Sequence, residues 1–121
     1  MAEACSVLIV EDDADTRDAL AAILESMGYA VAAAGDGIDA LEHLRSSACT
    51  CLIVLDLFMP RMNGWAFREE QMKDPQLSTI PVVVVSADPA AARQAASLGV
   101  AATMAKPLDF DRLAKVVAQY C

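Results

Sequence analysis

The feature that most constrains the fold is an alternation between short apolar runs and segments with the period of an amphipathic helix. The apolar runs are residues 7–10, 29–33, 51–55, 82–85 and 100–104. Because a strand followed by a helix recurs five times, the sequence predicts a parallel β-sheet covered by helices. The third and fourth runs are apolar at both alternating positions, as expected of strands that are buried on both faces.

The intervening segments carry the helix signals. In the first of them, Leu20, Ile23, Leu24 and Met27 recur at the spacing of one helix face, and Gly28 suits the helix end. Further helices are predicted around residues 40–44, over 65–72, from Pro89 to about Leu98, and after Asp109, with Phe110, Leu113, Ala114 and Val117 on the buried face. We therefore predict a doubly wound α/β sandwich, and the 121 residues fit a single domain spanning residues 1–121.

The charge balance excludes some functions. Asp plus Glu total 17 against 9 Lys plus Arg, which gives a formal net charge of −8. Nucleic-acid binding needs clustered basic side chains, so an acidic domain is expected instead to bind cations or a basic protein surface. No apolar run approaches the length that spans a bilayer, so we expect no membrane association.

The cysteines are interpreted as reduced. No signal-peptide pattern is present, so we expect a cytoplasmic protein in which Cys5, Cys49, Cys51 and Cys121 are free thiols. A metal site at Cys49 and Cys51 is disfavoured because the chain has one histidine and no second close cysteine pair. Buried structural cysteines are the preferred interpretation.

Polar residues follow four of the five apolar runs. They are Glu11, Asp12 and Asp13 after the first run, Asp56 after the third, Ser86 after the fourth and Lys106 after the fifth. The carboxyl ends of parallel strands meet at one edge of a sheet, so these groups should gather there. Crowded carboxylates favour a hard divalent ion such as Mg²⁺, while a lysine and a hydroxyl can contact phosphate oxygens. An aspartate is a known phosphoryl acceptor, so the set suits phosphoryl transfer.

Four motifs then identify a resemblance that covers the whole chain. They are VLIVEDD (residues 7–13), LDLFMPRMNG (55–64), VVVVSA (82–87) and AKPL (105–108). In this order, each at the end of an apolar run, they resemble the response-regulator receiver domain of two-component signalling. The resemblance implies a flavodoxin-like sheet of order 2-1-3-4-5 and a signalling switch rather than an ordinary enzyme. No output domain is expected within this chain.

The resemblance also implies roles for individual residues. Asp56 would accept a phosphoryl group from the phosphohistidine of a histidine kinase or a phosphotransfer protein. Mg²⁺ would be bound by Asp12, Asp56 and the backbone carbonyl of Phe58, with Glu11 acting through water. Ser86 and Lys106 would contact the phosphoryl group, and the peptide before Pro107 is a candidate for the cis form. From the residues themselves, Asp13 remains an alternative ligand, although a helix N-cap is the simpler interpretation.

Three positions depart from the family pattern. Glu11 stands where aspartate is more common. Thr103 stands three residues before Lys106, where relatives usually carry an aromatic side chain that turns inward on activation, so that relay is absent or is replaced by another residue. Phe58 stands two residues after Asp56, where many relatives have a polar side chain; we expect its bulk to slow the attack of water on the acyl phosphate.

Two other functions fit these residues less well. Haloacid-dehalogenase-type phosphatases use Asp-x-Asp, but here Phe58 occupies the second position. A degenerate receiver that is never phosphorylated is disfavoured by the complete acidic, serine and lysine set. Trp65 is expected to be a packing residue and His43 to face solvent. Asn63 and Gly64 are expected to allow a positive φ in the loop after Asp56.

Overall fold

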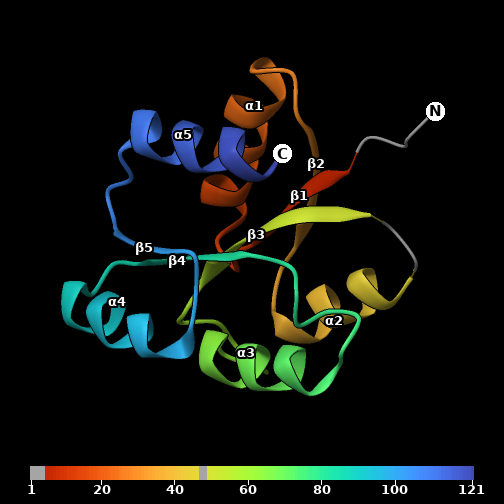
Figure 1. Cartoon of the computed structure of the whole chain (residues 1–121). Helices are drawn as coiled ribbons and strands as arrows, with labels where there is room; N and C mark the ends of the chain where they lie inside the picture. Colours follow the sequence, from red (N-terminus) through yellow and green to blue (C-terminus); the bar gives the residue numbers. More distant parts are fainter. Residues whose placement is uncertain (1–4, 47–48) are drawn as a thin grey trace.

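The computed structural model describes residues 5–46 and 49–121, and its centre is a five-stranded parallel sheet of order β2-β1-β3-β4-β5 (Figure 1). The strands are β1 (Ser6–Val10), β2 (Ala30–Ala34), β3 (Thr50–Asp56), β4 (Val82–Ser86) and β5 (Ala102–Ala105). The helices are α1 (Ala14–Ser26), α2 (Gly37–Arg45), α3 (Gly64–Lys73), α4 (Pro89–Ala95), which continues into a 3₁₀ turn, η1 (Ala96–Leu98), and α5 (Phe110–Tyr120). The predicted fold class and strand order are therefore confirmed.

Two apolar clusters lie on opposite faces of the sheet. Helices α1 and α5 cover one face, where Leu24 and Leu113 pack against Val54. Helices α2, α3 and α4 cover the other, where Phe67 is fully buried. Residues 82–85 of β4 face both clusters, which explains why that segment is valine at every position. Among the described residues, no helix is long and apolar enough to cross a membrane.

Two residues expected on buried helix faces are exposed. Met27 is 42% exposed because α1 ends at Ser26 and Met27 is its C-cap. Phe110 is 46% exposed because it is the first residue of α5, where the chain has just left the sheet. The helix period was correct in both segments, but an element's end packs less completely than its middle. The single domain predicted over residues 1–121 stays a prediction, and its residues 1–4 and 47–48 lie outside the described ones.

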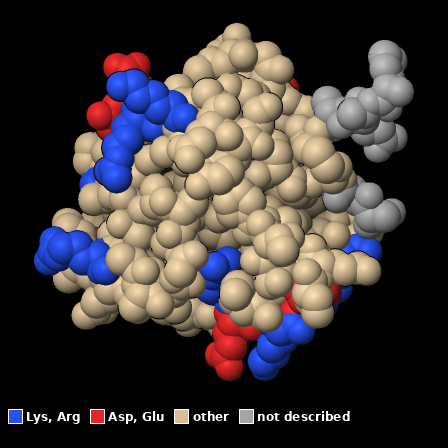
Figure 2. All heavy atoms as spheres, viewed as in Figure 1, with Lys and Arg blue, Asp and Glu red and all other residues tan. Residues whose placement is uncertain are grey.

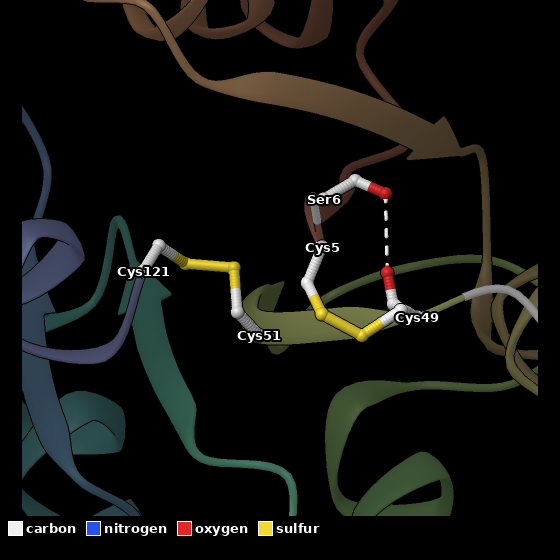
Figure 3. The surroundings of a disulfide bond; sticks show 5 residues. All are labelled: Cys5, Ser6, Cys49, Cys51 and Cys121. Carbon is white, nitrogen blue, oxygen red and sulfur yellow. Dashed lines mark hydrogen bonds between the residues drawn. A yellow bond between two sulfur atoms is a disulfide. The ribbon is translucent and has the colours of Figure 1, made fainter. Parts of the chain in front are cut away.

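The expectation of four free, buried thiols is wrong. Cys5 is bonded to Cys49 and Cys51 to Cys121 (Figure 3), and none of the four is fully buried. Strand register explains the first pair, because Ser6 of β1 is aligned with Thr50 of β3, which places the preceding residues 4.7 Å apart at their Cα atoms. The second pair forms because α5 ends over the start of β3, with the Cα atoms 5.5 Å apart.

Each helix begins with an acidic or amide side chain as its N-cap, namely Asp13, Asp36, Asn63, Asp88 and Asp109. Each of these side chains accepts a backbone N–H of the first turn, as N-caps do. In a parallel α/β fold, helices start beside the carboxyl ends of the strands. Several acidic residues therefore collect at that edge for a structural reason, and they must be separated from any that act chemically.

Two smaller expectations also fail. Asn63 caps α3 with a φ of −75°, and the positive φ in that loop belongs to Arg61, at 60°. His43 is half-buried rather than facing solvent, and its Nε2 atom is buried without a hydrogen-bond partner among the described residues. Trp65 is partly buried against the cluster beneath α2 and α3, as expected of a packing residue.

Candidate functional site

Four strand ends meet at the carboxyl edge of the sheet. Val10 of β1 is aligned with Leu55 of β3, Asp56 with Val85 of β4, and Ser86 with Ala105 of β5. The residues that follow β1 and β5 are Glu11 and Lys106, so the predicted polar residues are brought to one edge by register alone. The backbone N–H of Lys106 donates to the carbonyl of Ser86 at 2.8 Å, which extends this alignment one residue beyond β5.

A carboxylate cluster forms the centre of this edge. Glu11, Asp12 and Asp56 each bring one carboxylate oxygen within 4.8 Å of the others. Glu11 and Asp56 are buried, whereas Asp12 is exposed. Burial, reinforced by the negative charge of Glu11, raises the pKa of Asp56 to about 6, although Lys106 and a hydrogen bond from the backbone N–H of Phe58 act in the opposite direction.

Lys106 lies closer to Glu11 than to Asp56. Its Nζ donates to Glu11 Oε2 at 3.0 Å and is 4.0 Å from Asp56 Oδ1. Glu11 is itself held in place, because its backbone carbonyl accepts a hydrogen bond from Nη1 of Arg17 at 2.9 Å. A glutamate at this position therefore reaches across to the lysine, and Glu11 rather than Asp56 is the nearer partner of Lys106.

Asp13 belongs to α1 and not to the cluster. Its side chain accepts from Oγ1 of Thr16 at 2.6 Å and from the backbone N–H of Asp15 at 3.3 Å. The hydrogen bond from Thr16 is the main cause that lowers the pKa of Asp13. Both oxygens are thus engaged in capping, which supports the N-cap interpretation over the alternative of Asp13 as a metal ligand.

Ser86 and Thr103 occupy the neighbouring strands. Ser86 is fully buried at the end of β4, and its Oγ accepts the backbone N–H of Asp88, the N-cap of α4, at 3.2 Å. A movement of the Ser86 side chain would therefore be felt directly at the start of α4. Thr103 is half-buried on the edge strand β5, at the position where the resemblance implies that relatives usually carry an aromatic side chain.

The loop after β3 carries Phe58, two residues after Asp56. Its side chain is 51% exposed, and its ring meets that of Trp65 edge to face, with centroids 5.3 Å apart. On the other side of the site, the peptide between Lys106 and Pro107 is cis, as the resemblance implied. A largely apolar groove of about 270 Å³ adjoins it, lined by Thr16, Leu20 and Phe110 among others.

The donor set fits a divalent cation. Three carboxylates face one ammonium group, which leaves a local formal charge of −2. A bound cation would stabilise the charged form of Asp56 and relieve its repulsion by Glu11, and so oppose the effects that raise its pKa. Hard oxygen donors at this spacing suit Mg²⁺, which retains several water ligands and typically takes only one or two protein carboxylates. The chemistry of this set therefore agrees with the predicted cofactor.

Sequence reasoning missed one group beside the site. Arg61, in the loop after β3, contacts Asp36 and Asp39 at the start of α2. No sequence pattern assigned a role to Asp36, and Arg61 was noted only as part of the motif at residues 55–64. No periodicity links two loops that are 25 residues apart, so the signal lies in the fold alone.

A parallel α/β sheet with a carboxylate and lysine cluster at its strand ends defines a class of phosphoryl-accepting signalling domains. The family model described as "Response regulator receiver domain" matches residues 7–118, and this chain belongs to that family. It is 30% identical over 120 residues to the response regulator Rre1 of Synechocystis sp., an alignment that covers 97% of this chain and 52% of Rre1. The chain thus spans about half the length of that relative.

Solved structures of receiver domains are similar to this chain. The signal receiver domain of a signal transduction histidine kinase from Syntrophus aciditrophicus superposes with a TM-score of 0.85 at 32% identity, covering 97% of this chain and 89% of that one. The receiver domain of the sensor histidine kinase PA1611 from Pseudomonas aeruginosa has a TM-score of 0.87 at 22% identity, over 98% of both chains, and shows the shared fold. That structure contains a magnesium ion coordinated in its active-site cleft.

Proposed function

We propose that this receiver domain is switched by phosphorylation of Asp56. The observation that supports this most directly is the cluster of Glu11, Asp12 and Asp56 beside Lys106 at the ends of adjacent strands. An Asp56 Oδ atom would attack the phosphorus of a phosphohistidine, the P–N bond would break, and the imidazole nitrogen would leave with the bonding electrons and take up a proton. Receiver domains partner histidine kinases, and the immediate donor here is proposed to be a kinase or a phosphotransfer protein.

The residues would divide this work. Asp12, Asp56 and the Phe58 carbonyl would hold Mg²⁺ directly and Glu11 through water; the ion, when bound, would neutralise charge on the transferring phosphoryl oxygens. Lys106 would exchange Glu11 for a phosphoryl oxygen, since its ammonium group already lies between Glu11 and Asp56. Ser86 would give up its contact with the backbone N–H of Asp88 to donate to the phosphoryl group, which would pull on the start of α4.

The experiment is phosphorylation by a small donor. Incubation with acetyl phosphate and Mg²⁺, followed by intact-mass measurement, should show the gain of one phosphoryl group. The adduct should be absent in Asp56→Asn and should not form when Mg²⁺ is chelated, while Asp13→Asn, a change at a neighbouring cap, should still be modified. Absence of an adduct in the wild type with Mg²⁺ present would contradict the proposal, and steady turnover of small phosphoesters would indicate an enzyme instead.

A cytoplasmic location and the absence of nucleic-acid and membrane partners stay predictions. The two disulfides set a condition on the location, because thiols in a reducing cytosol normally stay reduced.

A further inference from the structure

The loop between β3 and α3 is built around an unfavourable backbone conformation. Arg61 has a φ of 60°, the one positive φ of a non-glycine residue in residues 5–46 and 49–121. Side chains with a Cβ atom avoid this region unless surrounding contacts hold them there. The same loop contains Phe58, whose carbonyl is the proposed backbone ligand of Mg²⁺. What holds Arg61 in place therefore bears on the site.

The Arg61 side chain spans the gap to α2. Its Nε donates to Asp36 Oδ2 at 2.6 Å, and its Nη2 donates to Asp39 Oδ1 at 3.1 Å. The Asp36 side chain is only 8% exposed, and its other oxygen caps α2 by accepting the backbone N–H of Asp39 at 2.9 Å. Asp36 is thus fixed by its own helix, and the guanidinium is the main cause that lowers its pKa.

The residues next to Arg61 strengthen this connection. A Cβ atom on Gly37 would lie 2.7 Å from Cγ of Met62, so the missing side chain at the start of α2 makes room for Met62. At the other end of the loop, a Cβ atom on Gly64 would lie 2.8 Å from the backbone oxygen of Asp56, and the Gly64 N–H donates to the Leu57 carbonyl at 2.8 Å. The loop is therefore packed on Asp56 at one end and tied to α2 at the other.

An isolated surface ion pair contributes little, and half of the Arg61 side chain is exposed. The contact to Asp36 differs from such a pair because one partner is buried and fixed, two carboxylates are engaged, and the arginine backbone is in a conformation that needs support. We propose that Arg61 is a positioning residue of the phosphorylation site: through Asp36 and Asp39 it sets the β3–α3 loop and thereby the direction of the Phe58 carbonyl at the metal site. This inference rests on the proposed function.

The test is the Mg²⁺ affinity of the unphosphorylated protein, measured by calorimetry and by the fluorescence of Trp65, the single tryptophan, which contacts Phe58. Arg61→Ala should weaken binding by about tenfold, at the low end for groups that support metal ligands. Arg61→Lys keeps the charge but not the two-pronged geometry, so it should lie between alanine and wild type. Arg61→Gly accepts the positive φ without the anchor and should also be intermediate.

The matched control is Arg45→Ala, which removes the same charge from the opposite end of α2, where Arg45 lies 4.0 Å from Asp74. It should leave Mg²⁺ affinity within about twofold of wild type, because a distant exposed charge is screened. Phosphorylation of Arg61→Ala by acetyl phosphate should be slow at limiting Mg²⁺ and approach the wild-type rate at saturating Mg²⁺. A purely structural role would instead lower the urea midpoint without moving the affinity.

Unchanged Mg²⁺ affinity in both Arg61→Ala and Arg61→Lys would overturn the inference, whatever their stability. The proposed function fails by a different result, the absence of an Asp56 adduct in the wild type. If Arg61→Ala does not fold, Arg61→Lys and Arg61→Gly alone decide: wild-type affinity in both contradicts the positioning role, and weakened affinity in both supports it.

Discussion

The carboxyl and amino ends of the sheet differ in the interactions that they contain. At the carboxyl end, three carboxylates face one lysine, and burial keeps the pKa of Asp56 raised. At the amino end, two disulfides connect the elements: Cys5 before β1 is bonded to Cys49 before β3, and Cys51 at the start of β3 is bonded to Cys121 after α5 (Figure 3). Much of the surface visible in Figure 2 carries neither acidic nor basic side chains. The contrast separates the end that carries the proposed phosphorylation site from the end that the two disulfides stabilise.

The charges buried towards the amino end also differ in kind from those at the site. Arg68 of α3 is buried and has no carboxylate partner in the part of the chain that the structure describes, and burial lowers its pKa. It donates to the carbonyls of Leu98 and Gly99 and to Gln71. Gln71 in turn donates to the carbonyls of Leu77 and Ile80, so the loops that lead into β4 and β5 are tied to α3. These polar groups are paired with backbone carbonyls and with each other, whereas the site gathers three carboxylates that repel one another.

The largest effect should come from breaking the amino end. Cys51 and Cys121 are 70 residues apart in sequence, so their bond restricts a long loop of the unfolded chain. Replacing both by alanine should lower the free energy of unfolding by about 4 kcal/mol, as loop-closure entropy predicts. Urea denaturation measures this, and Mg²⁺ affinity at the other end of the sheet should change by less than about twofold.

Reduction of the wild type provides the control, since a reductant breaks both disulfides and should lower stability at least as much, while having no effect on a variant lacking all four cysteines. Thiol titration of the unreduced protein should find none free. Four titratable thiols, or an alanine variant as stable as wild type, would contradict the comparison and restore the original interpretation of reduced cysteines.

A smaller effect of opposite sign is expected at the carboxyl end. The pKa of Asp56 is about 6 in the folded protein, above that of an unfolded aspartate, so the folded state binds a proton more tightly. Without Mg²⁺, the stability that protonated Asp56 contributes is therefore present below about pH 4, is lost as the pH rises through about 6, and changes little above that. Asp56→Asn should stabilise the protein by about 1–3 kcal/mol near pH 8 and by almost nothing near pH 4.

Addition of Mg²⁺ to the wild type should raise the urea midpoint at the higher pH, while Asp56→Asn should respond less. A neutral cap replacement, Asp13→Asn, should not stabilise, because hydrogen bonding lowers the pKa of Asp13 and its charged form favours folding. If Asp56→Asn destabilises the protein in Mg²⁺-free buffer at pH 8, the charged form of Asp56 does not oppose folding, and the comparison between the two ends of the sheet is wrong.

These two ends also differ in how far the sequence predicted them. The site residues follow apolar runs, and parallel strands bring their carboxyl ends together whatever their exact register, so Asp56, Ser86 and Lys106 could be assigned to one edge. The identity of the lysine's nearer partner could not be assigned, because Nζ lies 3.0 Å from Glu11 and 4.0 Å from Asp56, a difference too small to follow from sequence spacing.

The disulfides and the Arg61 contacts were missed for a related reason. Pairing Cys5 with Cys49 requires knowing that β1 and β3 are neighbours and that Ser6 is aligned with Thr50. Placing Arg61 on Asp36 requires a loop conformation with a positive φ, which an arginine does not signal. Local patterns therefore predict which edge carries the chemistry, while contacts between loops depend on three-dimensional detail.

The smallest effect expected is a rate change confined to the site. Phe58 is half exposed and packs against Trp65 at its edge, so its removal should cost little stability. We expect Phe58→Asn to shorten the lifetime of phosphorylated Asp56 by a few-fold, on the order of 1 kcal/mol in activation free energy, because a polar side chain admits and orients water. Loss of the phosphoryl adduct with time, followed by intact mass, measures this.

The control for this prediction is Phe58→Leu. It should keep the wild-type lifetime within about twofold, because leucine is apolar and excludes water without an aromatic ring. Equal or slower decay in Phe58→Asn would show that the side chain at this position does not guard the acyl phosphate.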